Sequence, residues 1–218
     1  CMCFLPLCHI AERMGGEYFS LYTGAKLNFV ENPATVPENV REIAPTVFTA
    51  VPRVWEKFYS GVMITLKEAS PLQRAVYGWA IGVGKKIADL VLAGQAVSGG
   101  LKAQFTLARW LALNNVRKLI GIHRARFLVT GAAPISPHIV RFFRTIGVPL
   151  IEVYGATETS GMVTGQRLSD LVPGCVGPAA EGVSLARGDH GELLVKGGIV
   201  FAGYYKSEEA TASALRDG

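Results

Sequence analysis

Apolar and polar residues follow two different periods along this chain, and the changes between them predict its elements. The apolar run at Phe127–Thr130 has the length of a buried strand. Ser136 and Pro137 mark a helix start, because serine is a favoured N-cap and proline fits the first helical position. Apolar residues at helical spacing follow as far as Gly147, where a C-terminal glycine cap belongs. With a second strand at 148–153, the pattern predicts a strand–helix–strand unit.

The same alternation occupies the first part of the chain. Residues 4–7, 26–30 and 46–51 are short apolar or β-branched runs, and helical patterns occupy 9–22, ended by Gly24, and 37–44. A β-α-β-α-β order of this kind is typical of a parallel, doubly wound sheet. The Pro-Arg pair at 52–53 then starts another helix.

Between residues 61 and 126 the pattern becomes helical throughout. Apolar residues recur at spacings of three and four in two stretches, around Val83 and around Phe105, with Ser98 and two glycines between them. We therefore expect two amphipathic helices, inserted between strands of the sheet.

After Gly161 the sequence becomes rich in turns and β-branched residues. It predicts short antiparallel strands at 183–186, 192–196 and 199–201, and a helix at 207–215 capped by Ser207. The expected fold class is α/β: a doubly wound parallel sheet with a helical insertion, followed by a small β-rich subdomain. We place the sheet subdomain at 1–165, with the insertion at 61–126, and an incomplete β-rich subdomain at 166–218.

Positive charge is concentrated in the insertion. Residues 61–126 hold ten lysines and arginines against Glu68 and Asp89, a net charge of +8, whereas the whole chain carries only +5. Two interpretations stay open: a solvated face of an ordinary helical cover, or a basic surface that lies on anionic lipid and gives peripheral membrane contact. No recognition motif accompanies the charge, so we expect no nucleic-acid binding.

Composition sets further limits. Half of the residues are hydrophobic, which is enough for a sizeable core, yet no uninterrupted apolar run reaches the ~18 residues of a membrane-spanning helix. The chain begins at Cys1 without a leader-like segment, so we expect a fragment of a larger protein that is cytoplasmic or peripheral at the membrane. Cys1, Cys3, Cys8 and His9 lack the usual zinc-ligand spacing, and buried free thiols are expected instead.

Candidate chemistry gathers in the loops after two predicted strands, where open α/β sheets bind ligands. The small residues at 131–133 carry so little side chain that a flat ring can lie against their backbone. The second loop offers an aromatic face in Tyr154, the hydroxyl of Thr157 and the carboxylate of Glu158. Hydroxyls suit phosphate oxygens, and Mg²⁺ is usually held by one or two carboxylates together with substrate phosphates.

These loops carry a family resemblance. The residues at 154–158, Tyr-Gly-Ala-Thr-Glu, resemble the YGxTE signature of the adenylate-forming (AMP-binding) superfamily, which includes acyl-CoA synthetases, luciferases and peptide-synthetase adenylation domains. The Gly-Ala-Ala-Pro turn at 131–134 is similar to that family's adenine-contacting turn. Further matches cover nearly the whole chain: LPLCH at 5–9, VPRVWEK at 51–57, GELLVKG at 191–197 and GYY at 203–205. VPRVWEK and the insertion after it are most similar to long-chain fatty acyl-CoA synthetases.

The resemblance implies an activity and a set of roles. Such acid–thiol ligases activate a fatty acid with ATP to an acyl-adenylate, release pyrophosphate, and pass the acyl group to coenzyme A. The family pattern assigns the catalytic roles to Thr157 and Glu158, with Glu158 as the Mg²⁺ ligand. It assigns ATP and AMP binding to Gly131, Ala132, Ala133, Tyr154, Gly155 and Thr157, and the substrate pocket to His9, Gly155 and Gly161.

The resemblance also implies an incomplete active site. The family's phosphate loop would precede residue 1, its ribose-binding aspartate would follow the segment 215–218, and its C-terminal domain with the catalytic lysine would come later. We therefore expect the 218 residues alone to be inactive. Two alternatives stay open: an adenylating enzyme that loads a carrier protein, and a non-catalytic nucleotide-binding module.

Overall fold

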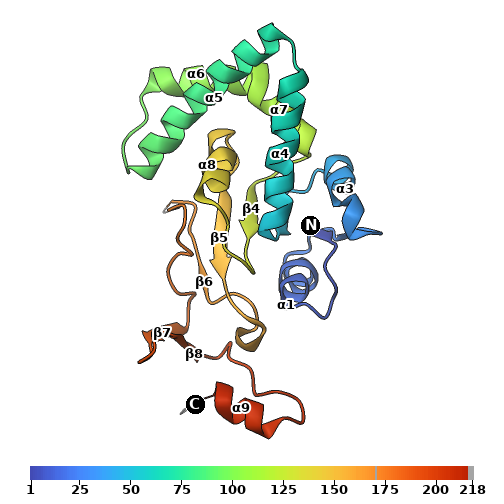
Figure 1. Cartoon of the computed structure of the whole chain (residues 1–218), viewed down its shortest axis with the longest axis vertical. Coiled ribbons are helices and arrows are strands. Elements are labelled where there is room, and N and C mark those ends of the chain that lie inside the picture. The colour runs from blue at the N-terminus through green and yellow to red at the C-terminus, as the bar shows by residue number, and fades with distance from the viewer. Residues whose placement is uncertain (170, 216–218) are drawn as a thin grey trace.

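A four-stranded sheet lies at the centre of the computed structural model, which describes residues 1–169 and 171–215 (Figure 1). Its strands follow the chain in spatial order: β3 (Val47–Ala50), β4 (Phe127–Thr130), β5 (Leu150–Tyr154) and β6 (Thr164–Gly165). The first three are parallel, and β6 runs antiparallel to β5. Helix α8 (Pro137–Thr145) joins β4 to β5, so the predicted strand–helix–strand unit is confirmed.

Helices cover both faces of this sheet. The alternate residues Phe48, Leu128 and Leu150 are fully buried on one face, where they pack in one core with residues of α8 and of α4 (Pro52–Glu68). On the other face lies a continuous helix built from α1 (Ile10–Glu12), a π-helical segment (Arg13–Tyr18) and α2 (Phe19–Thr23). Gly24 ends that helix with φ +69°, as the sequence predicts. The sheet is therefore doubly wound.

The N-terminal strands form a pair of their own. The short strands β1 (Met2–Cys3) and β2 (Asn28–Phe29) pair in parallel, and within the described residues neither pairs with the central sheet. The prediction of a strand at 4–7 is wrong. The Phe4 and Leu5 amides donate to the buried carboxylate of Glu12 and not to a neighbouring strand. A 3₁₀ turn (Pro33–Thr35) and α3 (Val36–Ile43) then lead to β3.

Helices α5 to α7 form the insertion and fold over the top of α8 in Figure 1. Helix α5 (Pro71–Leu92) begins with a capping box, in which Ser70 and Gln73 satisfy each other's backbone amides. Helix α6 (Gly99–Ala108) is capped by Ser98 and includes the two glycines that were expected between the helices. It continues through a π-helical segment (Arg109–Leu113) into α7 (Asn114–Ile120). Among the described residues, no helix is long and apolar enough to cross a membrane.

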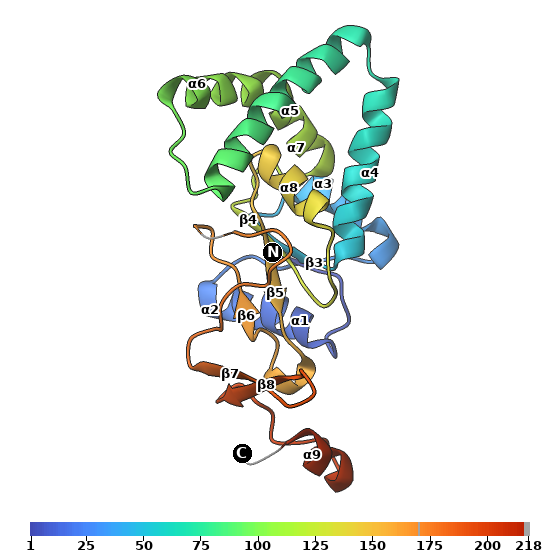
Figure 2. The ribbon, with the colours of Figure 1, turned by 60° about the vertical axis from the view of Figure 1, so that its left-hand side comes forward.

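The C-terminal part lies at the other end of the molecule from the insertion (Figure 2). Strands β7 (Val183–Arg187) and β8 (Leu193–Gly197) form an antiparallel hairpin. Helix α9 (Glu208–Ala214) agrees with the helix predicted at 207–215. The strand expected at 199–201 is absent there, and the Ser207 side chain makes no capping bond. The division at residue 165 stays a prediction. The Gly174 amide, which lies beyond it, donates to Glu152 Oε1 of β5. Residues 216–218, beside the expected ribose-binding segment, lie outside the described residues.

Candidate active site

The loops after β4 and β5 leave the sheet side by side, at its carboxyl edge. A Cβ on Gly131 would come 2.8 Å from Val153 Cγ2, so a side chain there would separate the two strand ends. A Cβ on Gly155 would overlap the carbonyl oxygen of Gly161, so glycine is required where the second loop folds back on itself. Ala132 has φ +67°, an unfavourable conformation for a residue with a Cβ. Both loops are thus held in tight shapes.

A cavity of about 430 Å³ opens between this edge, the adjacent face of the sheet and the helix at 10–23. Six residues expected in the site line it: His9, Gly131, Ala132, Tyr154, Gly155 and Gly161. Most of the remaining wall is apolar and includes Met14, Phe19, Val47, Phe127 and Val129. Three expected residues, Ala133, Thr157 and Glu158, are not part of the wall. The sequence did not indicate Met14 and Phe19 as wall residues, because only the tertiary fold turns their helix toward the sheet.

His9 lies exposed at the rim of this cavity. Its Nδ1 accepts a hydrogen bond from the Ala11 amide at 3.1 Å, so the imidazole also caps the helix that begins at Ile10. A nitrogen that accepts from an amide carries no proton, and any proton of the neutral ring is therefore on Nε2. Histidine is an uncommon N-cap, and this second role was not evident from the sequence.

Glu158 lies in a 3₁₀ turn (Thr157–Thr159) after β5 and is held by a segment far along the chain. Tyr204 Oη donates to Glu158 Oε1 at 2.6 Å, and the Phe201 amide donates to the Glu158 carbonyl at 2.8 Å. The Tyr204 bond, together with a backbone bond, lowers the pKa of the Glu158 carboxyl and so favours its ionised form. Within the turn, Thr159 Oγ1 accepts from the Ala156 amide at 3.0 Å.

This architecture agrees with the comparison to known families. The model of the AMP-binding enzyme family matches residues 1–205. The chain belongs to the AMP-binding enzyme family. A Mycobacterium tuberculosis protein provisionally named fatty-acid–CoA ligase fadD11 is 36% identical over 97% of this chain and 37% of its own length. The long-chain-fatty-acid–CoA ligase ACSBG2 of Gallus gallus is 34% identical over 99% of this chain and 29% of its own length. The chain thus spans about a third of the length of these relatives.

Solved structures show the same fold. The structure of ATP-bound MatB from Rhodopseudomonas palustris has a TM-score of 0.63 and is 22% identical, covering 99% of this chain and 35% of that one. The predicted family membership and fold class are confirmed.

The side chains of this AMP-binding domain fit a metal that arrives with its nucleotide. Among residues 1–169 and 171–215, no three metal-ligating side chains gather in one place, so a metal held by protein ligands alone does not fit. Glu158 does offer one half-buried, ionised carboxylate beside the exposed hydroxyl of Thr157. One carboxylate with substrate phosphates is a usual Mg²⁺ environment. Glu158 thus fits Mg²⁺ bound together with ATP.

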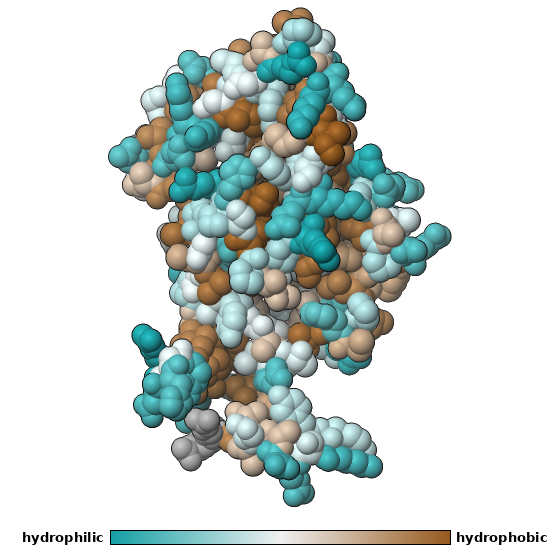
Figure 3. Space-filling model, in the orientation of Figure 1, coloured by the Kyte–Doolittle hydropathy of each residue, from teal (hydrophilic) through white to brown (hydrophobic). Residues whose placement is uncertain are grey.

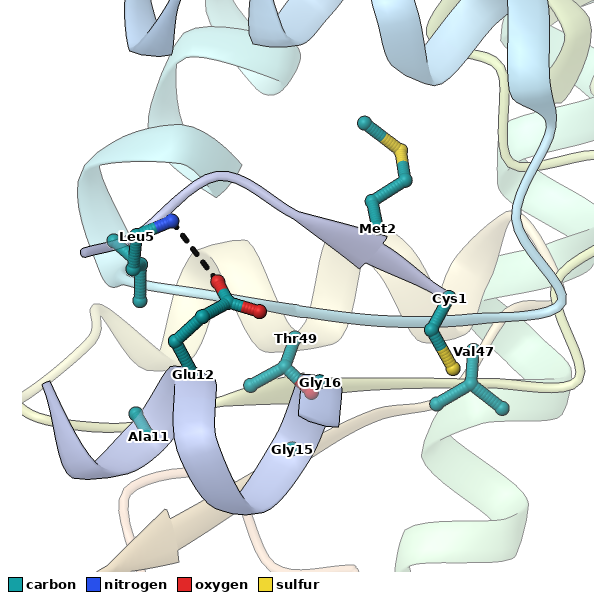
Figure 4. A pocket seen from close by; sticks show the side chains of 9 residues that line it. All are labelled: Cys1, Met2, Leu5, Ala11, Glu12, Gly15, Gly16, Val47 and Thr49. Atoms are coloured by element: carbon teal, nitrogen blue, oxygen red, sulfur yellow. Dashed lines mark hydrogen bonds between the residues drawn. The ribbon is translucent and has the colours of Figure 1, made fainter. Parts of the chain in front are cut away.

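A second carboxylate, that of Glu12, holds a segment of the cavity wall in place. Glu12 is 4% exposed, and its Oε2 accepts from the amides of Phe4 and Leu5 at 3.1 and 2.9 Å. Figure 4 shows this carboxylate between the N-terminal strand and the helix, above Gly15 and Gly16. Leu5 and His9 lie on the segment that Glu12 holds, and both line the large cavity. The helical pattern at 9–22 gave no sign of this role of Glu12.

The cysteines do not follow the expectation of buried thiols throughout. All four are free; Cys3 is buried, whereas Cys8 and Cys175 are exposed. Cys8 belongs to the loop that precedes the helix at 10–23, so its side chain lies outside the core. Burial, and next the negative charge of Glu12, raise the pKa of the Cys3 thiol to about 11.

Proposed function

We propose that this chain is part of a fatty acyl-CoA synthetase, to which it contributes the adenine turn, the Mg²⁺ carboxylate and much of the acyl pocket. One observation carries the proposal: an apolar cavity of about 430 Å³ that is bordered by the small-residue turn, Tyr154 and His9. Apolar walls of this extent fit a hydrocarbon chain. The relatives named fatty-acid–CoA ligases support the same substrate class.

In the proposed reaction, an oxygen of the fatty-acid carboxylate bonds to the α-phosphorus of ATP, and pyrophosphate leaves. Tyr154 stacks on the adenine, whose edge lies on the backbone of 131–133. Thr157 donates its hydroxyl to phosphate, and Glu158 would hold the Mg²⁺ that is bound with ATP. When bound, the metal would neutralise phosphate charge. The apolar wall excludes water from the acyl end, which protects the acyl-adenylate from hydrolysis.

The test is ATP–pyrophosphate exchange by the complete protein, with fatty acids of graded length. Glu158→Gln keeps the shape of the side chain but removes its charge. Because losing one such electrostatic contact costs about 2.7–4 kcal/mol, we expect exchange to fall by ~10²–10³ with an unchanged melting temperature. Glu56→Gln makes the same chemical change on an exposed face of α4 and should leave exchange unaltered. Near-normal exchange in Glu158→Gln would remove Glu158 from the site.

The exchange assay and a measurement of thioester formation together separate the other candidate functions. A non-catalytic nucleotide-binding module would bind ATP but exchange no pyrophosphate with any fatty acid. An enzyme that loads a carrier protein would exchange pyrophosphate but form no thioester with free coenzyme A. We expect acyl-CoA to accumulate when coenzyme A is supplied, and its absence would reassign the acceptor.

We also propose that the insertion contacts membrane, through a surface that we call the Trp110 patch. Leu107, Trp110 and Leu111 follow one another at helical spacing and are 49, 73 and 42% exposed. Lys102, Arg109 and Lys118 are exposed on the same run of helix, whereas Arg117 is buried and does not contribute. Figure 3 shows hydrophobic and hydrophilic side chains side by side over the insertion, at the top of the view. Exposed tryptophan beside cations fits the headgroup region of anionic lipid.

Vesicle binding tests the Trp110 patch. Replacing Lys102, Arg109 and Lys118 by Gln should abolish most binding to phosphatidylglycerol vesicles, and rising salt should weaken binding by the unmodified protein. A control with Lys26, Lys57 and Lys196 changed to Gln loses the same charge from other exposed places. Equal losses in both triple variants would mean that only net charge matters and that the patch is an ordinary solvated cover.

A further inference from the structure

Glu158 is held twice by one short segment of the C-terminal part. The Phe201 amide donates to its carbonyl, and the Tyr204 hydroxyl donates to its Oε1 at 2.6 Å across 46 residues of sequence. A backbone bond alone would fix the turn but leave the carboxylate free to rotate. The hydroxyl bond adds the missing constraint, because it selects one orientation of the carboxylate plane.

Tyr204 is itself held in place. Its amide donates to Thr211 Oγ1 at 2.9 Å, and its ring packs edge-on against Phe201 with 4.8 Å between ring centroids. Gly203 allows this approach: its φ is +142°, and a Cβ there would come 2.6 Å from Thr211 Cγ2. Helix α9 therefore fixes the position from which the hydroxyl reaches Glu158.

The neighbouring tyrosine shows what is specific to this contact. Tyr205 is 88% exposed, and its ring lies under the ammonium group of Lys206, 5.2 Å from the ring centroid. Tyr204 is 40% exposed and directs its hydroxyl to the carboxylate. Of these two adjacent tyrosines, Tyr204 bonds to Glu158, whereas Tyr205 contacts Lys206.

A carboxylate has about four lone-pair sites on its two oxygens, so one phenolic donor leaves room for a metal and a further donor. Side chains that hydrogen-bond a metal ligand orient it, and removing them typically weakens metal affinity by roughly 10–100-fold. We propose that Tyr204 is a positioning residue: its hydroxyl orients the Glu158 carboxylate for the Mg²⁺ that accompanies ATP. This inference rests on the proposed function, in which Glu158 holds that ion.

The experiment compares Tyr204→Phe with Tyr205→Phe in the complete protein. Tyr204→Phe keeps the ring that packs on Phe201 and removes only the hydroxyl. Three quantities are measured: the Mg²⁺ concentration that gives half-maximal ATP–pyrophosphate exchange, the dissociation constant of Mn²⁺ in the presence of ATP by electron paramagnetic resonance, and the melting temperature. Because the bond is partly exposed, we expect a loss near the lower limit, about tenfold in both metal measurements, for Tyr204→Phe alone.

A double-mutant cycle with Glu158→Gln shows whether Tyr204 acts through Glu158. If it does, Glu158→Gln/Tyr204→Phe binds Mn²⁺ no more weakly than Glu158→Gln. The inference is overturned if the two losses simply add, if Tyr204→Phe matches Tyr205→Phe, or if Tyr204→Phe needs less Mg²⁺, which would make the hydroxyl a competitor of the metal. The Mn²⁺ titration separates this inference from the proposed function. If the wild-type protein shows no pyrophosphate exchange, the proposed function is wrong, and the titration still decides whether Tyr204 orients Glu158.

Discussion

Removing the Glu12 carboxylate should loosen the segment that carries Leu5 and His9. In Glu12→Ala the amides of Phe4 and Leu5 lose their acceptor. A buried donor left without a partner costs about 1–3 kcal/mol. Phe4 is buried, but Leu5 is half-buried, so water recovers part of its share. We therefore expect the local structure to lose roughly 2–4 kcal/mol.

Hydrogen exchange measures this loss where it occurs. A loss of 2 kcal/mol or more increases the open population about 30-fold, because each 1.4 kcal/mol is a factor of ten. The amides of residues 4–5 in the complete protein should exchange faster by at least that factor. Glu12→Gln keeps a neutral acceptor and should lie between the wild type and Glu12→Ala. Because the loosened segment lines the cavity, the KM for the fatty acid should rise more than kcat falls.

Glu17→Ala is the matched control, since Glu17 is a half-buried acid on the same helix whose carboxylate holds neither amide. Two results would contradict this role of Glu12: equal amide exchange at residues 4–5 in Glu12→Ala and Glu17→Ala, or an equal rise in exchange over the whole sheet in Glu12→Ala. The second result would mean that Glu12 supports the fold in general and does not hold this segment.

Three further outcomes follow from the structure. Burial raises the pKa of Glu152, so its contribution to stability is present at low pH and is lost as pH rises through the folded-state pKa; Glu152→Gln should therefore raise the melting temperature more at pH 7 than at pH 4. Gly155→Ala should abolish pyrophosphate exchange, because its Cβ would overlap the carbonyl oxygen of Gly161; normal exchange would show that the loop can shift freely. At pH 8 iodoacetamide should label the exposed Cys8 and leave Cys3, whose pKa is about 11, unmodified; equal labelling by mass spectrometry would contradict its burial.

Most of the elements and the family membership follow from local patterns in the amino-acid sequence. Strands β3, β4 and β5, helices α3 to α6 and α9, and the glycine that ends the first helix were all predictable. Their signals are local: the apolar period, a serine or proline at a helix start, and a glycine that allows positive φ. The Tyr-Gly-Ala-Thr-Glu loop was equally visible, because its residues are contiguous and its backbone shape depends on its own glycines.

Contacts between residues that are distant in the sequence depend on the tertiary fold. Tyr204 stood out in the sequence only as part of a family motif, and its bond to Glu158 exists because β7, β8 and α9 fold back to the carboxyl edge of the sheet. The amides of residues 4–5 donate to Glu12 and not to a neighbouring strand, because a buried carboxylate requires hydrogen-bond donors. A side chain's hydrogen-bond partner depends on distance in space, and the hydrophobic period of a chain contains no measure of that distance.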